Sequence, residues 1–120
     1  MKVKSFAYLL FLVSAHHSTL PFDGTQPTRL AGVVTKFAWQ NPHCYIDIDV
    51  KDGKGKIEHW TIESESLSLL QRLGWSKDLL KAGDHLSSIG ARARNGSQIM
   101  RCKIIELSDG RKLPCFPEAL

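Results

Sequence analysis

The stretch 44–50, CYIDIDV, most constrains what this chain can fold into. Apolar side chains alternate there with polar ones: Cys44, Ile46, Ile48 and Val50 share one face, and Tyr45, Asp47 and Asp49 share the other. This period of two is typical of a β-strand with one face in a core and the other in water. The turn sequence KDGKGK at 51–56 and the stretch 57–63 then predict a hairpin and the next strand.

The remaining pattern predicts three more strands and one helix. β-Branched and aromatic residues predict a strand over 30–39, in which Gly32 marks a bend. A leucine stripe predicts a helix over 65–73, with Ser64 as its cap and Gly74 as its left-handed end. The later elements are a helical turn at 76–81, strands at about 85–93 and 99–107, the turn RNGS at 94–97 between them, and a small hairpin at 108–113.

Three strands, a helix and two more strands follow one another in the order of the OB-fold, a five-stranded Greek-key β-barrel. A small open sandwich of the same elements is the alternative, because strand order cannot be read from one sequence. Residues 30–120 are expected to form this single OB-like domain. Residues 16–29 contain two prolines and a glycine and are expected to be an irregular N-terminal arm.

The composition fits one ordinary globular domain, with 42% hydrophobic and 23% charged residues in a chain of 120. Sixteen Lys and Arg against 12 Asp and Glu give a net charge of +4, but Lys2 and Lys4 lie in a leader segment. Without these two lysines, 14 basic and 12 acidic residues leave a net charge of +2. The electrostatic field of so small a net charge argues against a nucleic acid as the partner.

Residues 1–15 are predicted to be a secretory signal peptide. Its parts are a positive start at Lys2 and Lys4, an apolar run of eight residues from Phe6 to Val13, and small residues at the cleavage site Val13-Ser14-Ala15. A membrane span needs about 20 apolar residues, so we expect no transmembrane span in the mature chain. Cleavage after Ala15 exports the protein, to the periplasm or out of the cell, with His16 as its first residue.

Short motifs at joint spacing run through the mature chain. They are His16-His17-Ser18, Phe22-Asp23, Leu30-x-Gly32-x-Val34, Trp39-x-Asn41-Pro42-His43, Trp60-x-x-Glu63, Leu70-x-x-x-Gly74-Trp75, Leu80-Lys81-x-Gly83-Asp84, Gly90 and Asp109-Gly110-Arg111-Lys112-Leu113. In this pattern the chain resembles an uncharacterised family of small secreted bacterial proteins, domain of unknown function 6152. The resemblance implies a small, secreted, β-rich protein, and it implies no activity.

The predicted mature N-terminus is a candidate metal site. An N-terminal histidine offers its amine and an imidazole nitrogen to one ion, a chelate that suits Cu(II), with Zn(II) or Ni(II) behind it. His17 adds a second imidazole, and His43 a third, because it shares the outward parity of Tyr45. The sequence therefore predicts copper, or another divalent metal, at His16, His17 and His43. The alternative is that the histidine pair is a solvated chain end and that His43 only bonds the adjoining turn.

A second candidate is a ligand groove lined by Trp39, Asn41, Tyr45 and Glu63, where aromatic and amide groups flank a bent strand. Core packing is the alternative role for the tryptophan. The sequence contains no nucleophile elbow, phosphate loop, HExxH or paired CxxC motif. We therefore expect a protein without catalytic residues or enzymatic activity.

Three cysteines cannot all pair within one chain. Cys44 has inward parity and is expected to be a buried free thiol. Cys102 and Cys115 flank a hairpin-like turn that can bring their α-carbons to the roughly 5.5 Å typical of a disulfide, and they are the predicted pair. A soft-metal site of Cys44, Cys102 and His43 is the weaker alternative.

Together these patterns predict an exported small binding protein, with Cu(II) as the leading ligand and no other cofactor indicated. The alternative is a structural or protein-interaction module of the cell envelope, which recognises another envelope protein by an edge strand. A nucleic-acid binder of the OB type comes third, because both export and the low net charge argue against it.

Overall fold

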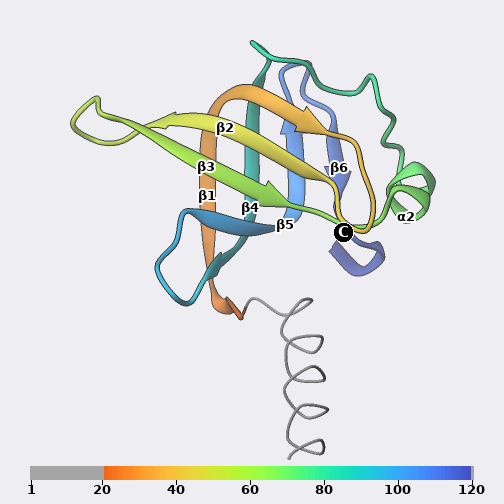
Figure 1. Cartoon of the computed structure of the whole chain (residues 1–120), viewed down its shortest axis with the longest axis horizontal. Coiled ribbons are helices and arrows are strands. Elements are labelled where there is room, and N and C mark those ends of the chain that lie inside the picture. Colours follow the sequence, from red (N-terminus) through yellow and green to blue (C-terminus); the bar gives the residue numbers. More distant parts are fainter. Residues whose placement is uncertain (1–20, 120) are drawn as a thin grey trace, which may run out of the picture.

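The computed structural model describes residues 21–119, which form a small β-barrel with short helical segments (Figure 1). Its elements are β1 (Phe22–Ala38), β2 (Tyr45–Lys51), β3 (Ile57–Glu63), α2 (Leu67–Arg72), β4 (His85–Ala93), β5 (Ile99–Leu107), β6 (Lys112–Pro114) and a 3-10 helix, η1 (Pro117–Ala119). The strands and helix predicted from the sequence are all present. The final hairpin predicted at 108–113 is the turn between β5 and β6.

The sheet is closed into a ring by one parallel pairing. Its strand order is β3-β2-β1-β4-β5-β6, and each of these neighbours is antiparallel. β3 then pairs with β5 in parallel, with Thr61 opposite Ile99 and Glu63 opposite Arg101. This closure is that of an OB-like barrel and excludes the open sandwich, so the fold predicted from the sequence is confirmed.

β1 serves two neighbours because it bends. Its first part pairs with β4 and its second part with β2, and Val33 has a partner on each side. The bend brings Gly32 against the β2 backbone: a Cβ placed there would lie 2.1 Å from the carbonyl oxygen of Asp49. Only glycine allows that approach, so the bend predicted at Gly32 has a steric cause.

The irregular arm predicted over residues 16–29 is wrong for its second half. β1 begins at Phe22, which pairs with Ala93 of β4, and Thr28 pairs with Gly90. A register shift between Asp23 and Thr28 lets the strand accommodate the proline and glycine that looked like loop signals. The extension depends on β4 as a partner, which no local pattern reveals. Residues 16–20 lie outside the described part.

The core consists of the inward side chains of the strands together with residues after β3. Ile46, Ile48 and Ile62 are at most 1% exposed, and Trp60 is 5% exposed, as the alternation in β2 and β3 predicts. Leu70 of α2 and Trp75 after it close the same cluster. The outer faces of β2 and β3 are left free for polar side chains, because the core takes every second residue.

α2 ends as the sequence predicts and begins differently. At its end Gly74 has a φ of 97°, its N–H donates to Gln71 O, and the N–H of Trp75 donates to Leu70 O, which is a Schellman motif. At its start Ser64 is not the cap, because the inward alternation of β3 continues through it and leaves it 1% exposed. The helix begins at Leu67 instead. The helical turn predicted at 76–81 is a single turn closed by the bond from Leu79 N to Ser76 O.

Asn41 caps α2 from the connection between β1 and β2. Its Oδ1 accepts a hydrogen bond of 3.0 Å from the N–H of Leu67, whereas Ser66, at the N-cap position, makes no side-chain cap bond. We therefore expect Asn41→Ala to lower the free energy of unfolding by about 1 kcal/mol, since one orphan N–H of the helix loses its partner. Urea unfolding followed by tryptophan fluorescence measures this, with Ser66→Ala as the matched control. An equal loss in both variants would contradict the assignment.

Candidate outer-face site

Three polar cross-strand pairs occupy the outer face of β2 and β3. The register places Tyr45 opposite Glu63, Asp47 opposite Thr61, and Asp49 opposite His59. Each pair is joined by its side chains: Tyr45 Oη donates to Glu63 Oε1 at 3.4 Å, Thr61 Oγ1 donates to Asp47 Oδ1 at 2.9 Å, and His59 Nδ1 contacts Asp49 Oδ1. This acidic stripe lies on the strands that OB-folds use for ligands, and its charge is unsuited to phosphate backbones.

Glu63, at the end of β3, contacts three other side chains of this face. Besides Tyr45, it contacts Arg101, whose guanidinium donates to Oε2 at 3.0 Å. The His43 ring lies on the other oxygen, with Nδ1 3.9 Å from Oε1. The Glu63 side chain is only 14% exposed, so these contacts are partly shielded from water.

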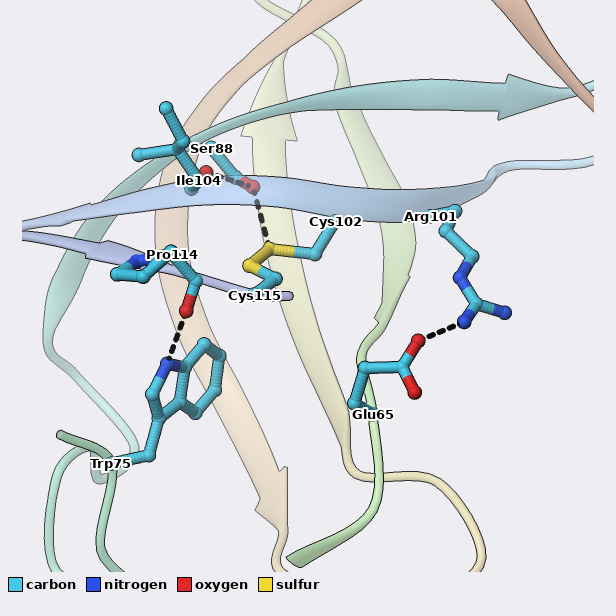
Figure 2. The surroundings of a disulfide bond; sticks show 8 residues. All are labelled: Glu65, Trp75, Ser88, Arg101, Cys102, Ile104, Pro114 and Cys115. Carbon is cyan, nitrogen blue, oxygen red and sulfur yellow. Dashed lines mark hydrogen bonds and ion pairs between the residues drawn. A yellow bond between two sulfur atoms is a disulfide. The ribbon is translucent and has the colours of Figure 1, made fainter. Parts of the chain in front are cut away.

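The parallel pairing of β3 and β5 places Arg101 opposite Glu63. Its second guanidinium nitrogen forms an ion pair with Glu65, just beyond the end of β3 (Figure 2). No sequence motif singles out Arg101 as a residue of this site. Its sequence pattern carries no signal for this, because the partner strand lies across a helix and another strand.

Burial raises the pKa of the Tyr45 hydroxyl, and the negative charge of Glu63 beside it raises the pKa further. Tyr45 therefore stays protonated at neutral pH and acts as a hydrogen-bond donor to Glu63. Together Tyr45, Glu63 and Arg101 form a polar network, and the His43 ring contacts its central carboxylate, that of Glu63.

Of the four residues predicted to line a ligand groove, the structure brings two together. Tyr45 and Glu63 are bonded to each other, as described above. Asn41 is occupied in capping α2, and Trp39 packs against the core cluster with its ring centroid 5.7 Å from that of Phe37. Core packing, the alternative considered for the tryptophan, therefore describes Trp39 better than a groove wall does.

Of the three predicted metal ligands, the structure describes one. His43 is described, and its side chain is 26% exposed at the edge of the polar face. His16 and His17 lie outside the described residues. Within 21–119, no group of three or more His, Cys, Asp or Glu side chains is placed to hold a metal ion. The soft-metal alternative built on Cys44, Cys102 and His43 is therefore not found.

Cys102 and Cys115 form a disulfide in the structure, with their α-carbons 5.7 Å apart (Figure 2). The bond ties the segment after β6 to β5. Around it, Ser88 Oγ lies 3.7 Å from Cys102 Sγ, and Trp75 Nε1 donates to Pro114 O at 2.9 Å. Cys44 is the free cysteine, 0% exposed, and burial raises the pKa of its thiol to about 12. It is therefore a protonated core residue at neutral pH.

Two solved structures show the same fold at low sequence identity. A ZRD-deleted mutant of TiaS, in complex with agmatine, is 17% identical with a TM-score of 0.55, over 81% of this chain and 28% of that chain. The mitochondrial single-stranded DNA binding protein Rim1 from S. cerevisiae is 12% identical with a TM-score of 0.51, over 72% of this chain and 97% of that chain. At these identities the likeness concerns the fold alone, and this chain spans little more than a quarter of the TiaS chain.

Three further findings concern membrane spans, curated sequences and family models. Among the described residues, no helix has the length and apolar character needed to cross a membrane. No curated protein sequence matches the chain. The model of a family of unknown function, DUF6152, matches residues 6–101, and the chain therefore belongs to the DUF6152 family.

Proposed function

We propose that this protein is exported and binds a divalent metal ion, Cu(II) foremost, through His16, His17 and His43. The observation that carries the proposal is the place of His43: its ring is partly exposed and lies with Nδ1 toward the carboxylate of Glu63. Histidines that bind metals almost always donate their other ring N–H to a carboxylate, a carbonyl or a water, and Glu63 Oε1 is the carboxylate oxygen that faces His43 Nδ1, at 3.9 Å. The predicted signal peptide supports export of the protein. Its removal after Ala15 frees the amine of His16 for the N-terminal chelate.

The length of chain between His16 and the start of β1 supports the same proposal. The described chain starts at a fixed point, where Arg94 N donates to Pro21 O at 2.9 Å and Arg94 Nε to Phe22 O at 3.1 Å. From β1 at that point to the end of β3, the path crosses β4 and β5, which is three strand spacings or about 14 Å. The five residues back to His16 can span up to about 17 Å. At full extension the chain back to His16 can therefore cover the lateral distance to the end of β3.

The chemistry of the donors favours copper. A terminal amine and three imidazoles form a nitrogen-rich set, and Cu(II) stands highest among divalent ions for such ligands. The carboxylates Asp47, Asp49, Glu63 and Glu65 around β2 and β3 add negative charge, which attracts a cation to this face.

We expect the protein beginning at His16 to bind one Cu(II) ion, because its free terminal amine completes the chelate. Adding one glycine before His16, or replacing His43 with alanine, is expected to weaken binding at least about tenfold, the effect of one lost nitrogen ligand. Isothermal titration measures the affinity, and His85→Ala, an exposed histidine at the start of β4, is the matched control. Mass spectrometry of the exported protein checks that His16 is the first residue.

An unchanged affinity in both the extended protein and the His43→Ala variant would contradict the metal proposal. It would leave the second candidate, a protein-interaction module of the cell envelope. That candidate is favoured by the first half of β3, which β5 does not cover, since their pairing starts at Thr61. Ile57 on this open edge is 43% exposed, unlike the other large apolar side chains of the described residues.

A further inference from the structure

We infer that Glu63 is the positioning residue of the metal site: its carboxylate holds the His43 ring with Nδ1 inward and leaves Nε2 for the ion. The inference rests on the proposed function and adds how Glu63 is itself held in place beside His43. Its starting point is the convergence of side chains from three separate segments on one carboxylate. They are His43 from the β1–β2 connection, Tyr45 from β2 and Arg101 from β5.

The backbone explains why His43 stays beside Glu63. The N–H of Ser64 donates to Cys44 O at 2.8 Å, and the N–H of Cys44 donates to Glu65 O at 3.0 Å. These two bonds join the residues directly after His43 to those directly after Glu63, so the two side chains emerge next to each other. Their closeness is thus imposed by the main chain and does not depend on the contact between the two side chains.

The two carboxylate oxygens of Glu63 have different partners. Oε2 accepts from Arg101 at 3.0 Å, and Oε1 accepts from Tyr45 at 3.4 Å and faces His43 at 3.9 Å. Arg101 and Tyr45 therefore hold the carboxylate in one orientation, from two sides. A carboxylate held in this way can orient an imidazole and strengthen its other nitrogen as a ligand.

The charge of the cluster leaves Glu63 available to the histidine. Arg101 is shared between Glu63 and Glu65, so one guanidinium serves two carboxylates. Two carboxylates and one guanidinium leave one formal negative charge in excess. The excess charge lies beside His43 and stabilises a cation bound to its outer nitrogen.

The test uses two readouts and a pair of matched variants. Glu63→Gln and Glu65→Gln each remove one carboxylate from the same cluster, but only Glu63 contacts His43. In the metal-free protein at pH 8, long-range 1H–15N NMR of His43 is expected to show the Nδ1–H tautomer in the wild type and in Glu65→Gln, and to lose it in Glu63→Gln. Cu(II) affinity by titration is expected to fall about 10–100-fold in Glu63→Gln and at most about threefold in Glu65→Gln.

The outcomes separate this inference from the proposed function. An Nε2–H tautomer in the wild type, or an equal loss of Cu(II) affinity in the two glutamine variants, would overturn the role of Glu63. In a His43→Ala background, Glu63→Gln is expected to have no further effect, and an undiminished effect there would also overturn it. If His43→Ala leaves the affinity unchanged while the tautomer result is as expected, the proposed metal site is wrong, and Glu63 orients a histidine that serves no ion.

Discussion

Reducing the Cys102–Cys115 disulfide is expected to lower the free energy of unfolding by about 3 kcal/mol. The two cysteines are 13 residues apart, and a cross-link closing a loop of this length restricts the unfolded chain by about that much. The bond also holds the C-terminal segment on the barrel, where Pro114 O accepts the indole N–H of Trp75. Loss of the bond therefore also loosens the anchor of a core tryptophan.

Guanidinium unfolding of the oxidised protein, the reduced protein and the Cys102→Ala/Cys115→Ala variant measures this effect. The reduced protein is the sharper comparison, because it keeps both buried sulfur atoms and loses only the cross-link. Cys44→Ala is the control, since it removes a buried thiol that belongs to no disulfide and is expected to cost about 1 kcal/mol. Unfolding of the oxidised and reduced proteins at the same denaturant concentration would show that the bond contributes nothing.

Gly90→Ala is expected to destabilise the barrel by about 3 kcal/mol, because an added methyl group has no space. A Cβ at Gly90 would lie 2.0 Å from the carbonyl oxygen of Arg101 and 3.1 Å from a side-chain carbon of Met100. The obstacle is the backbone of β5, at the register shift between β4 and β5, so no side-chain rotation relieves it. The sheet itself has to move at the point where it carries Arg101.

Gly24→Ala is the matched control for this prediction. Gly24 also lies in a strand of the same barrel, but a Cβ there meets no atom within 4 Å. Its replacement is expected to change the free energy of unfolding by less than about 1 kcal/mol. Thermal and urea unfolding of both variants compare the two positions. Equal stabilities would mean that the sheet yields at Gly90 without cost.

Much of the fold could be predicted because the strands, turns and helix end depend on short-range sequence patterns. The alternation at 44–50 specifies which face of β2 is buried, and Gly74 specifies where α2 ends. Both signals act within a few residues, where side-chain period and glycine's freedom at positive φ decide the outcome. The start of α2 differs from the prediction by contrast, because Ser64 has the chemistry of a cap but the position of a buried strand residue.

The candidate site was predictable only in fragments. The sequence predicts that Tyr45 and Glu63 line one groove, and the register of one hairpin brings them together. The sequence predicts a groove position for Asn41, whereas its oxygen caps a helix 26 positions later in the chain. No local pattern singles out Arg101, which binds a glutamate 38 positions earlier in the chain.

The amino-acid sequence by itself determined the strands, the hairpin turns, the helix end and the inward face of the barrel, because each depends on neighbours a few residues away. Only the tertiary structure decided that β1 extends back to Phe22, that β3 meets β5, and that Glu63 therefore gathers His43, Tyr45 and Arg101. The physical reason is that strand partners are selected by closure of the whole sheet around its core, and no single segment carries that information.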